Sequence, residues 1–291
     1  MAIRQETPDQ RVVCTGSIYL VQRRPMHDHI IINDVYQGIR VIAPWQAEDV
    51  LRVPFTPQFS KSGVIDAWCC RVDGETVLVM NEESRTASWL SLAPPGESYD
   101  LTVPPASDVH ALFDIRYLWE RESFWMLVGK SHRFYTLDLR EGVPVLIPGK
   151  ALKARIMYPL WCRALDAVKI QQCNVLRVAP DQQYMLYHDF SVRPGRIGMI
   201  NWRSGGTWTS PAPQDVPRLA FLEGRMFVLH EHEVHAINEA GEIEVVYAAP
   251  RGFHYHDLDV LPAQNGHPAA LVLACNSLNL RDSQLQIFGL T

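Results

Sequence analysis

One hairpin pattern recurs along the chain and limits the folds that it can adopt. Each copy has a short apolar run, a polar turn and a second, alternating run, as in HIIIND-VYQG-IRVIAP and TVLVMN-EESR-TASWLSL. The residues that end or follow the first run lie 42 to 59 residues apart and are Asn33, Asn81, Gly129, His188, His230 and Asn276. Alternating runs broken by turn residues indicate β-hairpins, and this spacing indicates a series of small repeated sheets.

Further runs flank the hairpins. An apolar run that suits an inner strand precedes each one, as in SIYLVQR and VIDAWCCRV, and a short run that ends near proline follows most of them, as in DVLRVPF and SYDLTVPP. Proline fits an outer strand, where one backbone donor can be spared. The sixth copy ends at Thr291 after its third strand. We therefore expect residues 10–14 to supply its outer strand and to close a ring of sheets, which removes two exposed sheet edges.

This order of strands resembles the β-propeller architecture, of the WD40 and YVTN kind, over nearly the whole chain. It matches no single propeller family, because Trp-Asp dipeptides and the Ser-x-Asp-x-Gly box of sialidases are absent and Gly-Gly occurs only at Gly205-Gly206. The resemblance implies an all-β fold with one domain over residues 1–291, built as six blades, or alternatively seven, around a central channel. Two β-sandwiches whose strands are spaced by chance are the alternative fold.

Residues 150–173 interrupt the repeat. Ala, Leu and Lys in this segment favour helix, and Pro159 breaks it. We expect a short helical insertion on the same face as the hairpin turns. It would act either as a plug over the ring or as an arm that contacts a partner.

The charge of the chain argues against nucleic acid and membranes as partners. The formal net charge is −5, whereas binding to phosphate or anionic lipid favours a basic surface. The N-terminal residues lack the apolar segment of a secretory signal, and the most apolar stretch, around residues 269–275, is far shorter than a membrane helix. Six cysteines without a Cys-x-x-Cys pair fit small buried side chains in a reducing compartment. We expect a cytoplasmic protein.

Histidines recur in three His-x-His units. Residues i and i+2 of a strand share a face, so such a pair can bind one Zn²⁺ or Mn²⁺ ion. The unit of His27 and His29 falls away from the other two in the propeller interpretation, whereas five histidines fall on one face of three successive blades. These five candidate metal ligands are His188, His230, His232, His254 and His256. The alternative is that they belong to polar turns and bind no metal.

Enzyme motifs are missing from the sequence. The chain lacks Gly-x-Ser-x-Gly, Gly-x-x-x-x-Gly-Lys, Gly-x-Gly-x-x-Gly and His-Glu-x-x-His. Asp257 and Asp259 share a strand face and could line the channel, but no spacing argument makes them an acid–base pair. We therefore expect no catalytic residue and no cofactor, with one bound divalent metal ion as the alternative.

The hairpin turns together form a polar and somewhat acidic ring, to which the insertion adds aromatic side chains. Aromatic anchors within a polar surround are typical of protein-binding surfaces, although an ordinary solvated rim has a similar composition. The candidate protein-binding residues are Asn33, Asp34, Glu82, Glu83, His132, Tyr158, Trp161, Asp189, Glu231 and Glu233.

These patterns favour a non-enzymatic propeller that binds another protein. One specific form is a bacterial immunity protein whose acidic face occludes a basic toxin or nuclease, since opposite charges speed association. A structural module with a permanent partner is a second form. The alternative from another class is a metal-dependent propeller enzyme, such as a lyase, a lactonase or a sugar-acid hydrolase, with its histidine site at the mouth of the channel.

Overall fold

A computed structural model describes most of the chain. It leaves out residues 1, 25–26, 36, 56–65, 70–75, 82–85, 94–95, 102–115, 120–121, 128–132, 141–142, 149–172, 179–183, 190–192, 202–203, 213–217, 231 and 291. The expected helical insertion over residues 150–173 lies outside the described residues except for Cys173. The same holds for the candidate binding residues Glu82, Glu83, His132, Tyr158, Trp161 and Glu231.

The described strands form six sheets in which strands that follow one another in the chain lie side by side and antiparallel. The first two sheets contain β3 (Val21–Arg23), β4 (Ile30–Asp34), β5 (Gly38–Ala43) and β6 (Glu48–Pro54), then β7 (Asp66–Cys69), β8 (Thr76–Asn81), β9 (Thr86–Ser91) and β10 (Glu97–Leu101). The next two contain β11 (Arg116–Trp119), β12 (Glu122–Leu127), β13 (Arg133–Arg140) and β14 (Val143–Pro148), then β15 (Cys173–Val178), β16 (Tyr184–Asp189), β17 (Gly195–Asn201) and β18 (Thr207–Ala212).

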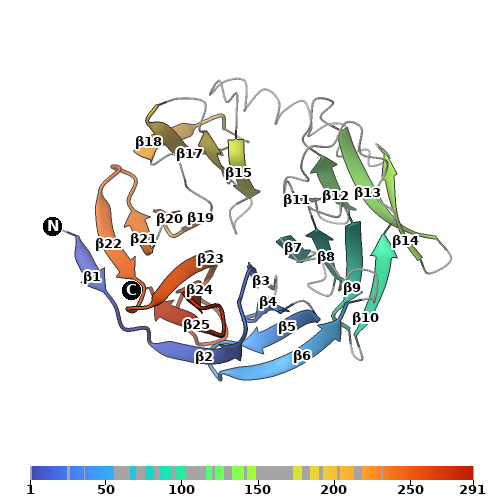
Figure 1. Cartoon of the computed structure of the whole chain (residues 1–291). Coiled ribbons are helices and arrows are strands. Elements are labelled where there is room, and N and C mark those ends of the chain that lie inside the picture. The colour runs from blue at the N-terminus through green and yellow to red at the C-terminus, as the bar shows by residue number, and fades with distance from the viewer. Residues whose placement is uncertain are drawn as a thin grey trace.

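The last two sheets also recruit strands from the start of the chain. The fifth contains β19 (Leu219–Leu222), β20 (Arg225–His230), β21 (Glu233–Ile237) and β22 (Ile243–Ala248), and the sixth contains β23 (Phe253–Leu261), β24 (Ala270–Ser277) and β25 (Asp282–Gly289). Figure 1 shows the six sheets arranged around a central axis. No helix occurs in the part of the chain that the structure describes, so none there could cross a membrane.

The middle strands whose burial the structure describes, such as β4, β20 and β24, are covered on both faces, and this explains their continuous apolar sequences. In β4, Ile30 and Ile32 pack against the sixth sheet, whereas Ile31, on the opposite face, packs against the second sheet. In β20, Phe227 packs toward the sixth sheet and Val228 toward the fourth. A sheet in a pair of sandwiches would bury one face only. The core therefore consists of layers between neighbouring sheets, which excludes the sandwich alternative for these sheets.

The two N-terminal strands join different sheets. β2 (Gln10–Thr15) covers the segment in which we expect an outer strand, and it pairs antiparallel with β25, with Cys14 opposite Ser283. β1 (Ile3–Gln5) pairs in parallel with β22 as a fifth strand of the neighbouring sheet, with Arg4 opposite Val246. The sequence does not predict β1, because a three-residue strand offers too little periodicity to be recognised.

Candidate functional site

Two asparagines at the ends of middle strands hold the chain that enters the ring at residues 17–20. Asn33 accepts hydrogen bonds from the amides of Tyr19 (2.6 Å) and Leu20 (3.1 Å) and donates one to the carbonyl of Ser17 (3.0 Å). Asn276 accepts from the amide of Ile18 and donates to the same residue's carbonyl, both at 2.9 Å. Only 3% of Asn33 is exposed. Its side chain therefore stabilises the fold and is not accessible on the candidate binding surface.

Asp257 joins three sheets near the central axis. One carboxylate oxygen accepts a hydrogen bond from the amide of Val21 in β3 (2.7 Å), and the other accepts one from Nε of Arg218 (2.9 Å), which directly precedes β19. Asp259 accepts a hydrogen bond from the amide of Arg23 at 2.7 Å. Asp257 is 1% exposed. These two carboxylates therefore connect inner strands, whereas the sequence suggested that they could line the channel.

The described acidic side chains among the candidate binding residues are all paired with arginine. Asp34 lies 3.3 Å from Arg52, and Asp189, which is fully buried, lies 2.8 Å from Arg196. Glu233 lies 2.9 Å from Arg4. The burial of Asp189 removes it from the surface, and the pairing of Asp34 and Glu233 leaves neither as an isolated negative charge. An acidic binding face is therefore not formed by the described members of this set.

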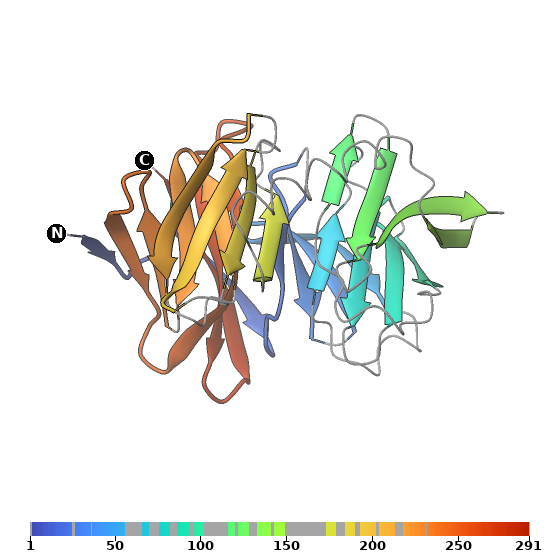
Figure 2. The ribbon, with the colours of Figure 1, turned by 90° about the horizontal axis from the view of Figure 1, so that it is seen from above.

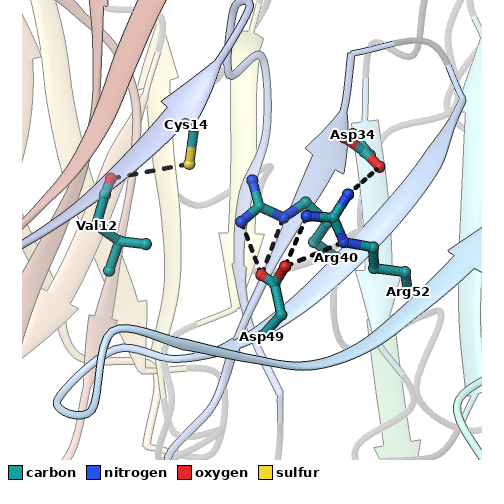
Figure 3. A network of polar contacts seen from close by, with 6 residues as sticks. All are labelled: Val12, Cys14, Asp34, Arg40, Asp49 and Arg52. Carbon is teal, nitrogen blue, oxygen red and sulfur yellow. Dashed lines mark hydrogen bonds and ion pairs between the residues drawn. The ribbon is translucent and has the colours of Figure 1, made fainter.

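Asp34 also belongs to the charged network of Figure 3, which lies on β4, β5 and β6 beside β2. Arg40 donates two hydrogen bonds to one oxygen of Asp49 (3.0 and 2.7 Å), and Arg52 donates two to the other oxygen (3.0 and 2.7 Å). Burial opposes ionisation of Asp49, but these bonds hold its pKa below the usual value. Burial raises the pKa of the nearby Cys14 thiol, although Arg40 opposes this rise.

The five histidines that the sequence suggests as metal ligands are not gathered into one group of ligands among the residues that the structure describes. Among the described residues, no three His, Cys, Asp or Glu side chains lie close enough together to bind one ion. His188 is fully buried in β16. In β23, a register shift between Tyr255 and Asp257 interrupts the regular alternation of side chains on which the expected pairing of His254 and His256 depended.

The rings of His254 and His256 instead meet edge to face, with centroids 6.3 Å apart. His256 also contacts the ring of Tyr19 edge to face, at 5.3 Å. Burial lowers the pKa of both histidines, and for His254 the nearby His232 lowers it further. His230 meets His235 in a similar edge contact at 6.1 Å. These contacts give the histidine rings a packing role, and burial favours the neutral forms of His254 and His256.

Comparison with known proteins identifies the fold. No protein family matches the sequence, and no curated protein does. Among solved structures, the β-propeller domain of Cps50 (Swd1) from Myceliophteria thermophila matches with a TM-score of 0.50 and 10% identity over 94% of this chain and 84% of that chain. The chain has a β-propeller fold. A nidogen/laminin complex matches with a TM-score of 0.50 and 9% identity over 80% of this chain and 81% of the other.

One turn of the propeller has exposed apolar side chains that the strand patterns do not predict. The turn between β24 and β25 exposes Leu278 (65%) and Leu280 (50%) on the face that also carries the turn between β20 and β21. In Figure 2 the red hairpin of β24 and β25 reaches the lower edge of the molecule. The signal in the sequence is the presence of two leucines in the otherwise polar turn SLNLRDS. A turn has no buried strand face that would require an apolar side chain.

Proposed function

We propose that this chain is a non-enzymatic propeller of six blades, closed by β2, that binds another protein on the face of the hairpin turns. A continuous series of contacts between neighbouring sheets supports the ring: β3 with β7, β10 with β14, β11 with β15, β15 with β19, β19 with β23, and β23 with β3. The observation that carries the binding function is the exposure of Leu278 and Leu280 at one turn, because adjacent exposed apolar side chains mark interaction sites.

More specific functions have less support. A protein that occludes a basic toxin needs unpaired acidic groups, but Asp34 and Glu233 are each paired with arginine. A metal-dependent enzyme needs a set of ligands, and no such set occurs among the described residues. We therefore propose protein binding without assigning toxin inhibition or metal catalysis. Cys14 and Cys275 are buried free thiols, which fits the cytosolic location that we also propose.

A matched pair of variants tests the binding function. The immobilised protein is incubated with lysate of its source organism, and retained proteins are identified by mass spectrometry. Leu278→Asn/Leu280→Asn should lose the partner that the wild type retains. Asparagine also suits the left-handed backbone at Leu280 (φ 59°), so we expect this variant to fold. Val13→Asn, which changes an apolar residue 79% exposed on β2, should retain the partner.

Two results would reject this function. One is that the wild type retains no protein above the level of bare resin. The other is that Leu278→Asn/Leu280→Asn and Val13→Asn retain the same protein equally well, because the turn would then make no contribution.

A further inference from the structure

The turn that carries the two leucines is held in one conformation by its own hydrogen bonds. The hydroxyl of Ser277 donates to the side-chain oxygen of Asn279 (2.7 Å), and that oxygen also accepts from the amide of Arg281 (3.0 Å). The amide of Leu280 donates to the carbonyl of Ser277 at 2.9 Å. A surface ordered before binding loses little entropy when a partner arrives. The turn is therefore suited to present its side chains to a partner.

Neighbouring segments also fix the turn to the rest of the propeller. The amide of Leu278 donates to the carbonyl of Gly252 (2.9 Å), in the connection between β22 and β23. The amide of Gly16 donates to the carbonyl of Arg281 (3.0 Å), which ties the turn to the chain between β2 and β3. Residues 251 and 278 thus lie on the same part of the face.

The local fold does not explain the choice of leucine at position 280. Its backbone has φ 59°, the left-handed region in which glycine and asparagine are favoured and a bulky side chain is strained. The side chain is half exposed, so it gains only part of the stabilisation that burial gives. Strained residues of this kind occur at binding sites, where a side chain must be held in place.

Two exposed arginines follow or precede the segments that carry the leucines, Arg281 in the same turn and Arg251 next to Gly252. Arg251 and Arg281 are exposed and form no ion pair with any described residue. This distinguishes them from Arg4, Arg52 and Arg196, which each bind a carboxylate. Asp282, the exposed residue that ends the turn, offsets one of the two positive charges. The patch formed by Arg251, Leu278, Leu280 and Arg281 is therefore apolar with a net positive charge.

We propose that this patch binds an acidic segment of a partner protein, in which carboxylate side chains lie beside apolar ones. The apolar side chains would cover Leu278 and Leu280, and the carboxylates would pair with Arg251 and Arg281, since guanidinium and carboxylate groups form charge-assisted hydrogen bonds. This inference rests on the proposed function and reverses the sign of the partner charge expected from the sequence. It concerns a protein partner, and nucleic acid is the competing possibility for a basic patch.

Fluorescence anisotropy with synthetic peptides tests the chemistry of the partner. The first peptide alternates Glu with Phe, the second replaces Glu by Lys, and the third replaces Phe by Ser. The wild type should bind the first peptide at least about tenfold more tightly than either of the others, and added salt should weaken this binding. A single-stranded RNA oligonucleotide should compete poorly. Equal binding of the Lys peptide, stronger binding of RNA, or no binding of the Glu–Phe peptide overturns the inference.

Charge-reversal variants separate this inference from the proposed function. Arg251→Glu and Arg281→Glu should each weaken binding of the Glu–Phe peptide, and of the partner retained from lysate, whereas Arg11→Glu, which reverses an exposed charge on β2, should not. If Leu278→Asn/Leu280→Asn loses the retained partner and both charge variants keep it, the propeller binds protein through this turn but the partner is not acidic. If no partner is retained at all, the proposed function itself fails.

Discussion

At the scale of single residues, buried polar side chains at the ends of strands hold other parts of the chain in place. Asn33 and Asp189 both follow apolar runs at the ends of strands, where a polar residue is ordinarily exposed. Asn33 instead binds the backbone of residues 17–20, and Asp189 is buried against Arg196. A single sequence cannot show that a polar side chain satisfies the backbone of a distant segment, because that depends on which strands become neighbours.

Asp257 gives the clearest prediction at this scale. Asp257→Ala should lower the free energy of unfolding by about 1–3 kcal/mol, because the buried amide of Val21 would lose its acceptor and the bond from the partly exposed Arg218 to this carboxylate would be lost. Urea denaturation followed by tryptophan fluorescence measures the change. Asp282→Ala, at an exposed position, serves as the control and should have little effect. Equal stability of the two variants would show that Asp257 does not join the sheets.

His256 should make stability depend on pH. Burial lowers its pKa in the folded state, although Asp257 raises it in part, so the unfolded state binds a proton more readily. The contribution of His256 to the free energy of unfolding is fully present above the pKa of this histidine in the unfolded state, about 6.5. It is lost as the pH decreases below that value. The free energy of unfolding of His256→Gln should therefore decrease less than that of the wild type between pH 7 and pH 5. A decrease of the same size in both proteins would contradict this.

At the scale of strands, periodicity predicted most of what the structure contains. Middle strands such as β4 and β24 read as continuous apolar runs because both of their faces are covered. The alternating exposure and the proline of outer strands such as β18 are typical of strands at the edge of a sheet. β1 escaped prediction because its three residues offer too little periodicity to be recognised as a strand.

The two N-terminal strands should differ in importance. Removal of residues 1–7 deletes β1 but leaves β2 paired with β25, so a stable monomer should remain. Removal of residues 1–15 exposes the edge of β25, and we expect aggregation or loss of the folded state, since open edges recruit other chains. Size-exclusion chromatography and thermal unfolding compare the two truncations. Identical behaviour would mean that β2 does not complete the sixth sheet.

At the scale of the whole molecule, the propeller fold brings together segments that are far apart in the chain. The face proposed for binding combines the chain at residues 16–17, the connection at residues 251–252 and the turn at residues 278–281, which hydrogen bonds hold together. The sequence predicted that hairpin turns share a face, and this follows from the repeat. It did not predict which turn carries the proposed binding residues, because the sign of the local charge depends on which arginines pair with carboxylates in the folded chain.

Hydrogen exchange measured by mass spectrometry, with and without the retained partner, tests the central claim most directly. The partner should slow exchange in peptides that cover residues 277–282 and 250–253, and it should leave the outer strands β2 and β6 unchanged. Slowed exchange on β2 or β6 alone, or no change at the turn between β24 and β25, would contradict the claim that this face of the propeller binds protein.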